Sequence, residues 1–138
     1  MTMSSRRAHS SDPIAAFRRA EELLSRRRPL EALDALGSVL AAGDPDDPPD
    51  ASVHLLAGRA YLDSAQLRRA EDEFTLVIEI DPADHYARFA LGRTLQRQGR
   101  LSEAETQLKM AVAMDPRPEY QEALGEVRAR IAVIGDRP

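Results

Sequence analysis

The middle of the chain contains the same sequence unit twice in tandem, and this repeat limits the possible folds more than any other feature. Identical or similar residues recur there at a spacing of 34 positions. The matching pairs are Leu55 with Phe89, Gly58 with Gly92, Leu67 with Leu101, Ala70 with Ala104, Phe74 with Leu108, and Asp81-Pro82 with Asp115-Pro116. Self-similarity at this period is typical of helical repeat arrays, in which stacked units bury a continuous core. We therefore expect an array of helix pairs that offers a binding surface.

Apolar residues recur at helical spacing along most of the chain, and no segment alternates with period two. In the first helix, for example, Ile14, Phe17 and Leu24 recur at this spacing. The expected fold class is all-α. The predicted helices cover 13–27, 29–42, 51–64, 67–80, 84–98, 102–114 and 118–134.

Prolines, aspartates and glycines mark the ends of these helices. Asp12 is an N-cap acceptor, and Pro13 follows it at the first helical position, where the missing N–H is not needed. Ser102 and Glu105 have the spacing of a capping box, which predicts the start of the sixth helix. Segment 43–50 contains three prolines and four aspartates, so it is interpreted as a linker, with Gly43 terminating the second helix.

The chain is expected to form one domain with short terminal segments. Residues 1–12 are mostly small, polar and basic, and too poor in apolar groups to offset the entropy lost on ordering. We expect them to be a disordered leader. The domain is predicted to span 13–134, with hairpins 13–46, 51–84 and 85–118, a capping helix 118–134, and a tail 135–138.

Composition narrows the class of protein and its partners. The chain has 138 residues, 43% hydrophobic and 30% charged, and its net charge of -4 argues against a nucleic-acid partner. The absence of cysteine excludes disulfides and thiolate metal sites. Lys109 is the only lysine among 19 basic residues, a bias typical of GC-rich bacterial genomes. No segment has the apolar length of a signal peptide or a membrane span, so we predict a cytoplasmic protein with no membrane partner.

No catalytic, cofactor or metal site is expected. The sequence contains no Walker loop, HExxH motif, dinucleotide glycine pattern or serine–histidine–acid spacing. His9 falls in the leader, His54 at a packing position, and His85 at the start of a helix. A lone helical histidine at a packing position is more often structural than catalytic. The aspartates of 43–50 lack the glycine turn and the distal glutamate of an EF-hand, which disfavours calcium binding.

The order of small, aromatic and proline positions in the unit resembles the tetratricopeptide repeat. In 51–84 the family positions are matched by Ala57-Gly58, Tyr61, Ala70, Phe74 and Pro82, and in 85–118 by Leu91-Gly92, Leu95, Gly99, Ala104, Leu108 and Pro116. The first hairpin departs more, because Ala20 stands where the glycine would be and Arg19 precedes it. The resemblance implies a right-handed superhelical array of three hairpins plus a C-terminal capping helix, with no catalytic residues to inherit.

The resemblance also implies that the first helix of each pair lines the concave side of the superhelix. Apolar side chains beside arginines on this side have the composition of a peptide groove. The predicted partner-binding residues are Phe17, Leu55, Arg59, Tyr86, Phe89, Arg93 and Arg97. An equally weighted alternative is that this row only packs one hairpin on the next, or that the last helix or a second copy covers it.

One specialised function can be tested on the sequence. Family members that act as heat-shock co-chaperones hold a partner's C-terminal carboxylate with lysine and asparagine side chains. The corresponding positions here hold Phe17, Glu21, Leu56, Tyr86 and Ala90, none of which is a lysine or an asparagine. We therefore do not expect a co-chaperone of that kind.

The function predicted from the sequence is that of an adaptor, which binds a protein or peptide segment in its concave groove without a cofactor. The main alternative is an assembly subunit that self-associates as a homo-oligomer or docks in a larger complex. A third is the regulation of an enzyme or a secretion system by docking.

Overall fold

The computed structural model describes residues 12–41, 46 and 48–135, and over these residues it consists of helices without a strand. The all-α prediction is therefore confirmed. The helices are α2 (Pro13–Ser25), α3 (Pro29–Ala41), α4 (Ala51–Asp63), α5 (Leu67–Ile80), α6 (His85–Arg97), α7 (Leu101–Met114) and α8 (Pro118–Gly135). Most of the predicted leader, Gly43 and the end of the tail lie outside the described residues.

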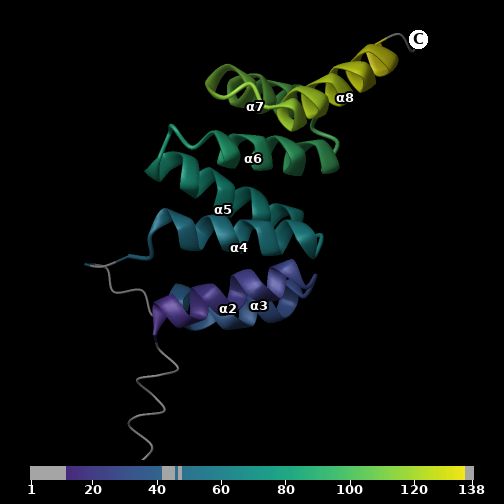
Figure 1. Ribbon diagram of the computed structural model, residues 1–138. Helices are drawn as coiled ribbons and strands as arrows, with labels where there is room; N and C mark the ends of the chain where they lie inside the picture. Colours follow the sequence, from purple (N-terminus) through teal and green to yellow (C-terminus); the bar gives the residue numbers. More distant parts are fainter. Residues whose placement is uncertain (1–11, 42–45, 47, 136–138) are drawn as a thin grey trace, which may run out of the picture.

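Successive helices pair into the hairpins α2–α3, α4–α5 and α6–α7, which stack in chain order with α8 on the last (Figure 1). The second helix of each hairpin also packs against the first helix of the next unit. In addition, α2 contacts α4, α4 contacts α6, and α6 contacts α8. The first helices therefore form a layer of their own, and every predicted partner-binding residue belongs to it.

Small residues facing large ones bring the two helices of a hairpin together. A Cβ added to Gly58 would lie 2.5 Å from Phe74 Cε1, and one added to Gly92 would lie 2.7 Å from Leu108 Cγ. Phe74 and Leu108 are both fully buried. The glycine that repeats at a spacing of 34 thus allows a close approach that any larger residue would prevent.

The turn inside each hairpin has the same geometry in all three hairpins. At its centre, Arg27, Ala65 and Gly99 adopt positive φ angles of 59°, 61° and 79°. The N–H of each next residue donates to the carbonyl five positions earlier, and the N–H of the central residue itself donates to the carbonyl three earlier. This is the Schellman arrangement, which satisfies the last carbonyls of the first helix. Only one of the three positions carries the glycine that suits this conformation.

The predicted capping box of the sixth helix is wrong. The helix begins at Leu101, one residue before Ser102, and its N-cap Arg100 makes no side-chain capping bond. The Schellman turn accounts for the difference, because the residue that closes it, Arg100, also becomes the N-cap of the next helix. Glu105 instead accepts from Arg128 Nε on α8, at 3.1 Å.

Charged residues face solvent at the N-terminal end of the array. Because the linker is longer, α2 aligns with α4 at a spacing of 38 instead of 34. On α4 the positions packed under α3 hold Leu56, Ala57 and Ala60, which are buried. The equivalent positions on α2 hold Arg18, Arg19 and Glu22, which are exposed. These residues suit solvent and not a preceding helix, so α2 forms a polar end to the stack.

The C-terminal end is closed in a comparable way. On α6, Leu91, Gly92 and Leu95 are buried under α7. On α8 the residues Gly125, Glu126 and Ala129 are exposed. Large apolar side chains are exposed on this helix only near its C-terminal end, at Val133 and Ile134.

Candidate binding surface

The predicted partner-binding residues lie along α2, α4 and α6, but they differ in how much they are exposed. Four of them are half-buried against the core, namely Phe17, Leu55, Tyr86 and Phe89. The arginines reach further out, since Arg59 and Arg97 are exposed and the side chain of Arg93 is 43% exposed. The structure thus brings half-buried apolar groups and guanidinium groups onto one helix layer.

The aromatic residues also hold neighbouring units together. The ring centroids of Tyr86 and Phe89 lie 6.0 Å apart, and Phe89 stacks on Tyr120 of α8 at 4.6 Å. Tyr120 is fully buried. Tyr120 is not among the residues predicted from the sequence, although its spacing of 34 from Tyr86 could have indicated it. Phe89 is therefore partly committed to packing, which limits what a partner can reach.

Polar contacts fix Tyr120 and the start of α8 over α6. The hydroxyl of Tyr120 lies 2.9 Å from Nδ1 of His85, and Nε2 of His85 lies 3.4 Å from a carboxylate oxygen of Asp115. Asp115 also accepts from Nε of Arg117, whose guanidinium lies 5.6 Å from the centre of the Tyr120 ring. Burial raises the pKa of Tyr120, which keeps its hydroxyl protonated. His85 thus has a structural contact that anchors α8.

The three arginines of the row have different partners. Arg93 donates to Glu126 on α8 at 3.1 Å, and Arg97 donates to the carbonyl of Leu62 near the end of α4 at 2.9 Å. Arg59 forms no hydrogen bond or ion pair with any other described residue. Arg59 is therefore the arginine of the row most available to an external acceptor.

Arg59 lies within electrostatic range of Tyr86. Burial raises the pKa of the Tyr86 hydroxyl, whereas the positive charge of Arg59 acts to lower it. The acidic groups of Glu119, Asp63 and Asp84 act in the same direction as burial. The surface around Tyr86 therefore contains both signs of charge, and its potential is not uniformly basic.

The positions that correspond to the co-chaperone clamp are not suited to bind a carboxylate. Leu56 and Ala90 are each only 3% exposed, so they belong to the core. Glu21 is exposed and carries the wrong charge for a carboxylate ligand. That the chain is not a co-chaperone of this kind remains a prediction, and the burial of Leu56 and Ala90 supports it.

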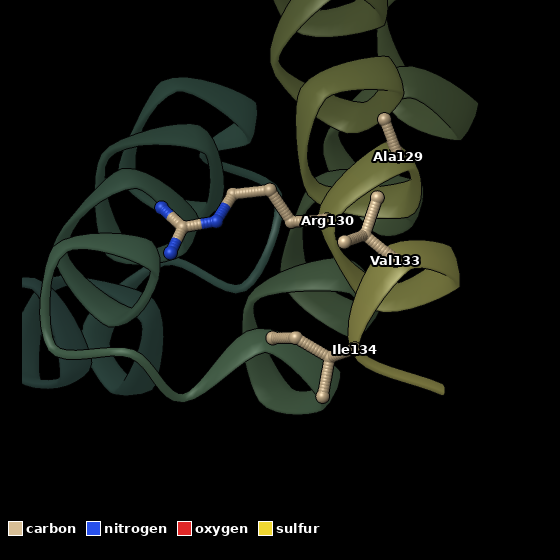
Figure 2. Close-up of a pocket in the computed structure, with 4 residues that line it drawn as sticks. All are labelled: Ala129, Arg130, Val133 and Ile134. Carbon is tan, nitrogen blue, oxygen red and sulfur yellow. The ribbon is translucent and has the colours of Figure 1, made fainter. Parts of the chain in front are cut away.

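Two hollows lie near helix ends. One of about 500 Å³ is lined by Leu24, Ser25, Arg27, Pro29, Asp63 and Arg97. Two arginines and one aspartate belong to its lining, so its side-chain charges sum to +1. The other, of about 280 Å³, lies on α8 and is lined by Ala129, Arg130, Val133 and Ile134 (Figure 2). Because all four residues belong to one helix, it lacks the opposed walls of a ligand pocket.

The described histidine and acidic side chains do not gather into a metal site. Among them, no three histidine, aspartate or glutamate side chains form a group that could hold a metal ion. His54 is 2.8 Å from Glu73 across the α4–α5 hairpin, which is a packing contact. None of the described helices is long and apolar enough to cross a membrane.

Comparison with known proteins identifies the repeat. Two tetratricopeptide repeat models match the chain, one over residues 51–84 and the other over residues 74–127. These matches include two of the predicted hairpins and much of α8. No curated protein matches the chain.

Solved structures of the same architecture resemble the whole array. A crystal structure of MamA has a TM-score of 0.82 at 14% identity, covering 94% of this chain and 74% of that one. The second tetratricopeptide domain of human RPAP3, in complex with an HSP70 peptide, has a TM-score of 0.75 at 20% identity, covering 84% and 94%. The Yersinia enterocolitica type III secretion translocator chaperone SycD has a TM-score of 0.69 at 19% identity, covering 88% and 81%. At these identities the likeness concerns the fold alone.

Proposed function

Because the chain belongs to the tetratricopeptide repeat family, we propose that it is a non-enzymatic adaptor that binds a segment of another protein along the inner layer formed by α2, α4 and α6. The observation that carries the proposal is the position of Arg59. This exposed cation has no partner among the described residues, and Tyr86 beside it is half-buried. A free guanidinium next to aromatic and aliphatic groups is the composition of interaction hot spots.

Different residues of the row have different roles in this proposal. Arg59 and Tyr86 contact the partner, with Leu55 and Phe17 supplying apolar area on either side. Phe89, Arg93 and Arg97 contribute less directly, because each already contacts another part of the chain. The partner segment carries acidic side chains or free carbonyls that accept from Arg59.

Related structures support this kind of function. The RPAP3 domain was determined with an HSP70 peptide, and the first tetratricopeptide domain of Spaghetti was determined with an HSP90 peptide. Our proposal does not extend to those peptides, since the clamp positions of this chain hold Leu56 and Ala90 in the core. We infer a cytoplasmic location from the sequence, which lacks a recognisable targeting segment.

The assembly alternative is less favoured by the ends of the array. End-to-end stacking would bury Arg18, Arg19 and Glu22 at one end and Glu126 at the other, at a cost in desolvation. We therefore expect a monomer, which light scattering after size exclusion can check. A stable dimer that dissociates on substitution of Arg59 or Tyr86 would favour the alternative in which a second copy covers the row.

A binding experiment can separate a role of Arg59 from a change in fold. A peptide selected from a random library for binding to the chain provides the probe. We expect Arg59→Glu to weaken binding about ten-fold or more, as expected for an interface arginine. Arg68→Glu is the matched control, because Arg68 is also exposed, pairs with no described residue and lies on α5. Equal affinity of both variants would contradict the proposed surface.

A further inference from the structure

Each hairpin has one pair of facing positions near the beginning of its first helix. On the second hairpin these positions hold His54 and Glu73, whose side chains lie 2.8 Å apart. On the third they hold Arg88 and Gln107, joined by a hydrogen bond of 3.3 Å. Both pairs link the two helices through a polar contact of a histidine or arginine side chain.

The first hairpin lacks this contact. At the spacing of 38 that relates it to the second hairpin, the equivalent positions hold Ala16 and Ala35. Instead of a polar bridge there is a pocket of about 360 Å³ between α2 and α3. Its lining residues are Asp12, Ala15, Ala16, Arg19, Asp34, Ala35 and Ser38. The pocket therefore occupies the place that a histidine or an arginine fills in the later hairpins.

The walls of the pocket are suited to a long basic side chain. Three alanines provide an apolar surface for an aliphatic stem. Asp12 and Asp34 place two carboxylates at the pocket, against one guanidinium from Arg19. Asp12 caps α2 by accepting from the N–H of Ile14, whereas Asp34 has no hydrogen-bond or ion-pair partner in the described part of the chain. The side-chain charges of the pocket thus sum to −1, with Asp34 available as an acceptor.

Arg88 serves as an internal template for the occupant. Its guanidinium donates to Gln107 and to the carbonyl of Pro82, and it also contacts the sulfur of Met110. The positions of Gln107 and Met110 correspond to Ala35 and Ser38 in the first hairpin. We propose that the α2–α3 pocket binds the side chain of an arginine presented by a partner protein, at a site separate from the inner layer. Its guanidinium would lie beside Ala35 and Ser38, as that of Arg88 lies beside Gln107 and Met110, and would donate to Asp34, which also lines the pocket.

The proposal can be tested with a minimal ligand. N-acetyl-L-arginine amide is titrated into the full chain labelled with ¹⁵N, and backbone amide shifts are followed. We expect saturable shifts at Ala15, Ala16, Ala35 and Ser38. N-acetyl-L-norleucine amide has a similar stem without the charge and should produce no saturable shift. No saturation with the arginine probe, or equal binding of the two probes, would overturn the proposal.

Two variants locate the contact. Asp34→Asn should weaken the arginine probe about three-fold, the size of one exposed ion pair. Ala16→His combined with Ala35→Glu copies the bridge of the second hairpin and should abolish binding by closing the pocket. If that double variant does not fold, the affinity of the Asp34→Asn variant for the arginine probe is the test. An affinity equal to that of the wild type refutes the site. Arg59→Glu should leave probe binding unaltered, which keeps this result independent of the proposed function.

Discussion

At the scale of single residues, the array depends on where glycine occurs and where it does not. Gly58 and Gly92 allow helices to touch, whereas Gly125 lies on an open face with nothing within 4 Å of an added Cβ. Gly99 has open space around it as well, but its φ of 79° disfavours any side chain. Two physically different constraints, contact and conformation, therefore act on residues that look alike in the sequence.

The contact constraint predicts a difference between two glycine variants. Gly92→Ala should lower the free energy of unfolding by about 1–3 kcal/mol, because the new Cβ would press on Leu108. Gly125→Ala is the matched control and should be neutral or stabilising by up to about 1 kcal/mol, since alanine favours the helix and meets no neighbour. Urea denaturation of both variants measures the difference. If both variants had equal stability, Gly92 would not lie at a close crossing.

The conformational constraint predicts effects of opposite sign at equivalent positions. Gly99→Ala should destabilise the chain by about 1 kcal/mol, the cost of placing a side chain in the left-handed region. Ala65→Gly should remove that cost at φ 61° and leave the stability equal or higher. Thermal melting of the two variants measures the sign of each change in stability. A stabilising Gly99→Ala would show that the turn does not hold this conformation in solution.

At the scale of elements, each hairpin must begin and end its helices within a few residues. Asp50 starts α4 by accepting from the N–H of Ser52 at 2.7 Å, and the Ser52 hydroxyl also donates to it. The side-chain hydrogen bond from Ser52 is the main cause that lowers the pKa of Asp50. The cap is thus strongest when the carboxyl group is ionised.

This cap predicts a pH-dependent stability. Because the pKa of Asp50 is lower in the folded chain, its contribution is fully present above the ordinary value of 3.8 and is lost as pH falls through the lowered value. Asp50→Ala should cost about 1 kcal/mol at neutral pH. Asp50→Asn should retain most of the free energy of unfolding at neutral pH. In acid its free energy of unfolding should fall by less than that of the wild type. Denaturation at neutral pH and near pH 3 measures both effects, and parallel acid losses in wild type and Asp50→Asn would contradict this role.

The sequence predicted the helices and the repeat because both depend on local pattern and spacing. It could not reveal the positive φ angles of Arg27 and Ala65, since neither residue type indicates that conformation. The stacking of Phe89 on Tyr120 was also missed, because it depends on how α8 sits against α6. For the same reason the sequence treated Arg59 and Arg93 alike, although Arg93 pairs with Glu126.

At the scale of the whole molecule, the array is a finite stack that ends with α8. Helix α8 is essential to this, because it covers the apolar side of α7 with Tyr120, Ala123, Leu124 and Val127, all buried. Its exposed residues include Glu126 and small residues, together with Val133 and Ile134 near its C-terminal end. The stack can therefore remain a separate molecule, which leaves its inner layer open to the proposed partner.

Without α8, the stack should no longer remain a separate, cooperatively folded molecule. Deletion of 119–138 is expected to cause aggregation or loss of cooperative unfolding, because it uncovers the side of α7 that packs against α8. Deletion of 136–138 is the control and should leave both properties unchanged. Light scattering and circular dichroism measure the outcome. A soluble, equally stable chain after the longer deletion would show that α8 is not required as a cap.

The central claim, that a partner segment lies along the inner layer, is tested most directly by site-specific photo-crosslinking. A benzophenone amino acid replaces Arg97 on the inner layer in one variant, which leaves Arg59 intact, and Arg68 on α5 in another, and each is irradiated in the native cell. The account predicts a discrete adduct with another protein from position 97 and none from position 68. Adducts formed only from position 68, or only between two copies of the chain, would contradict it.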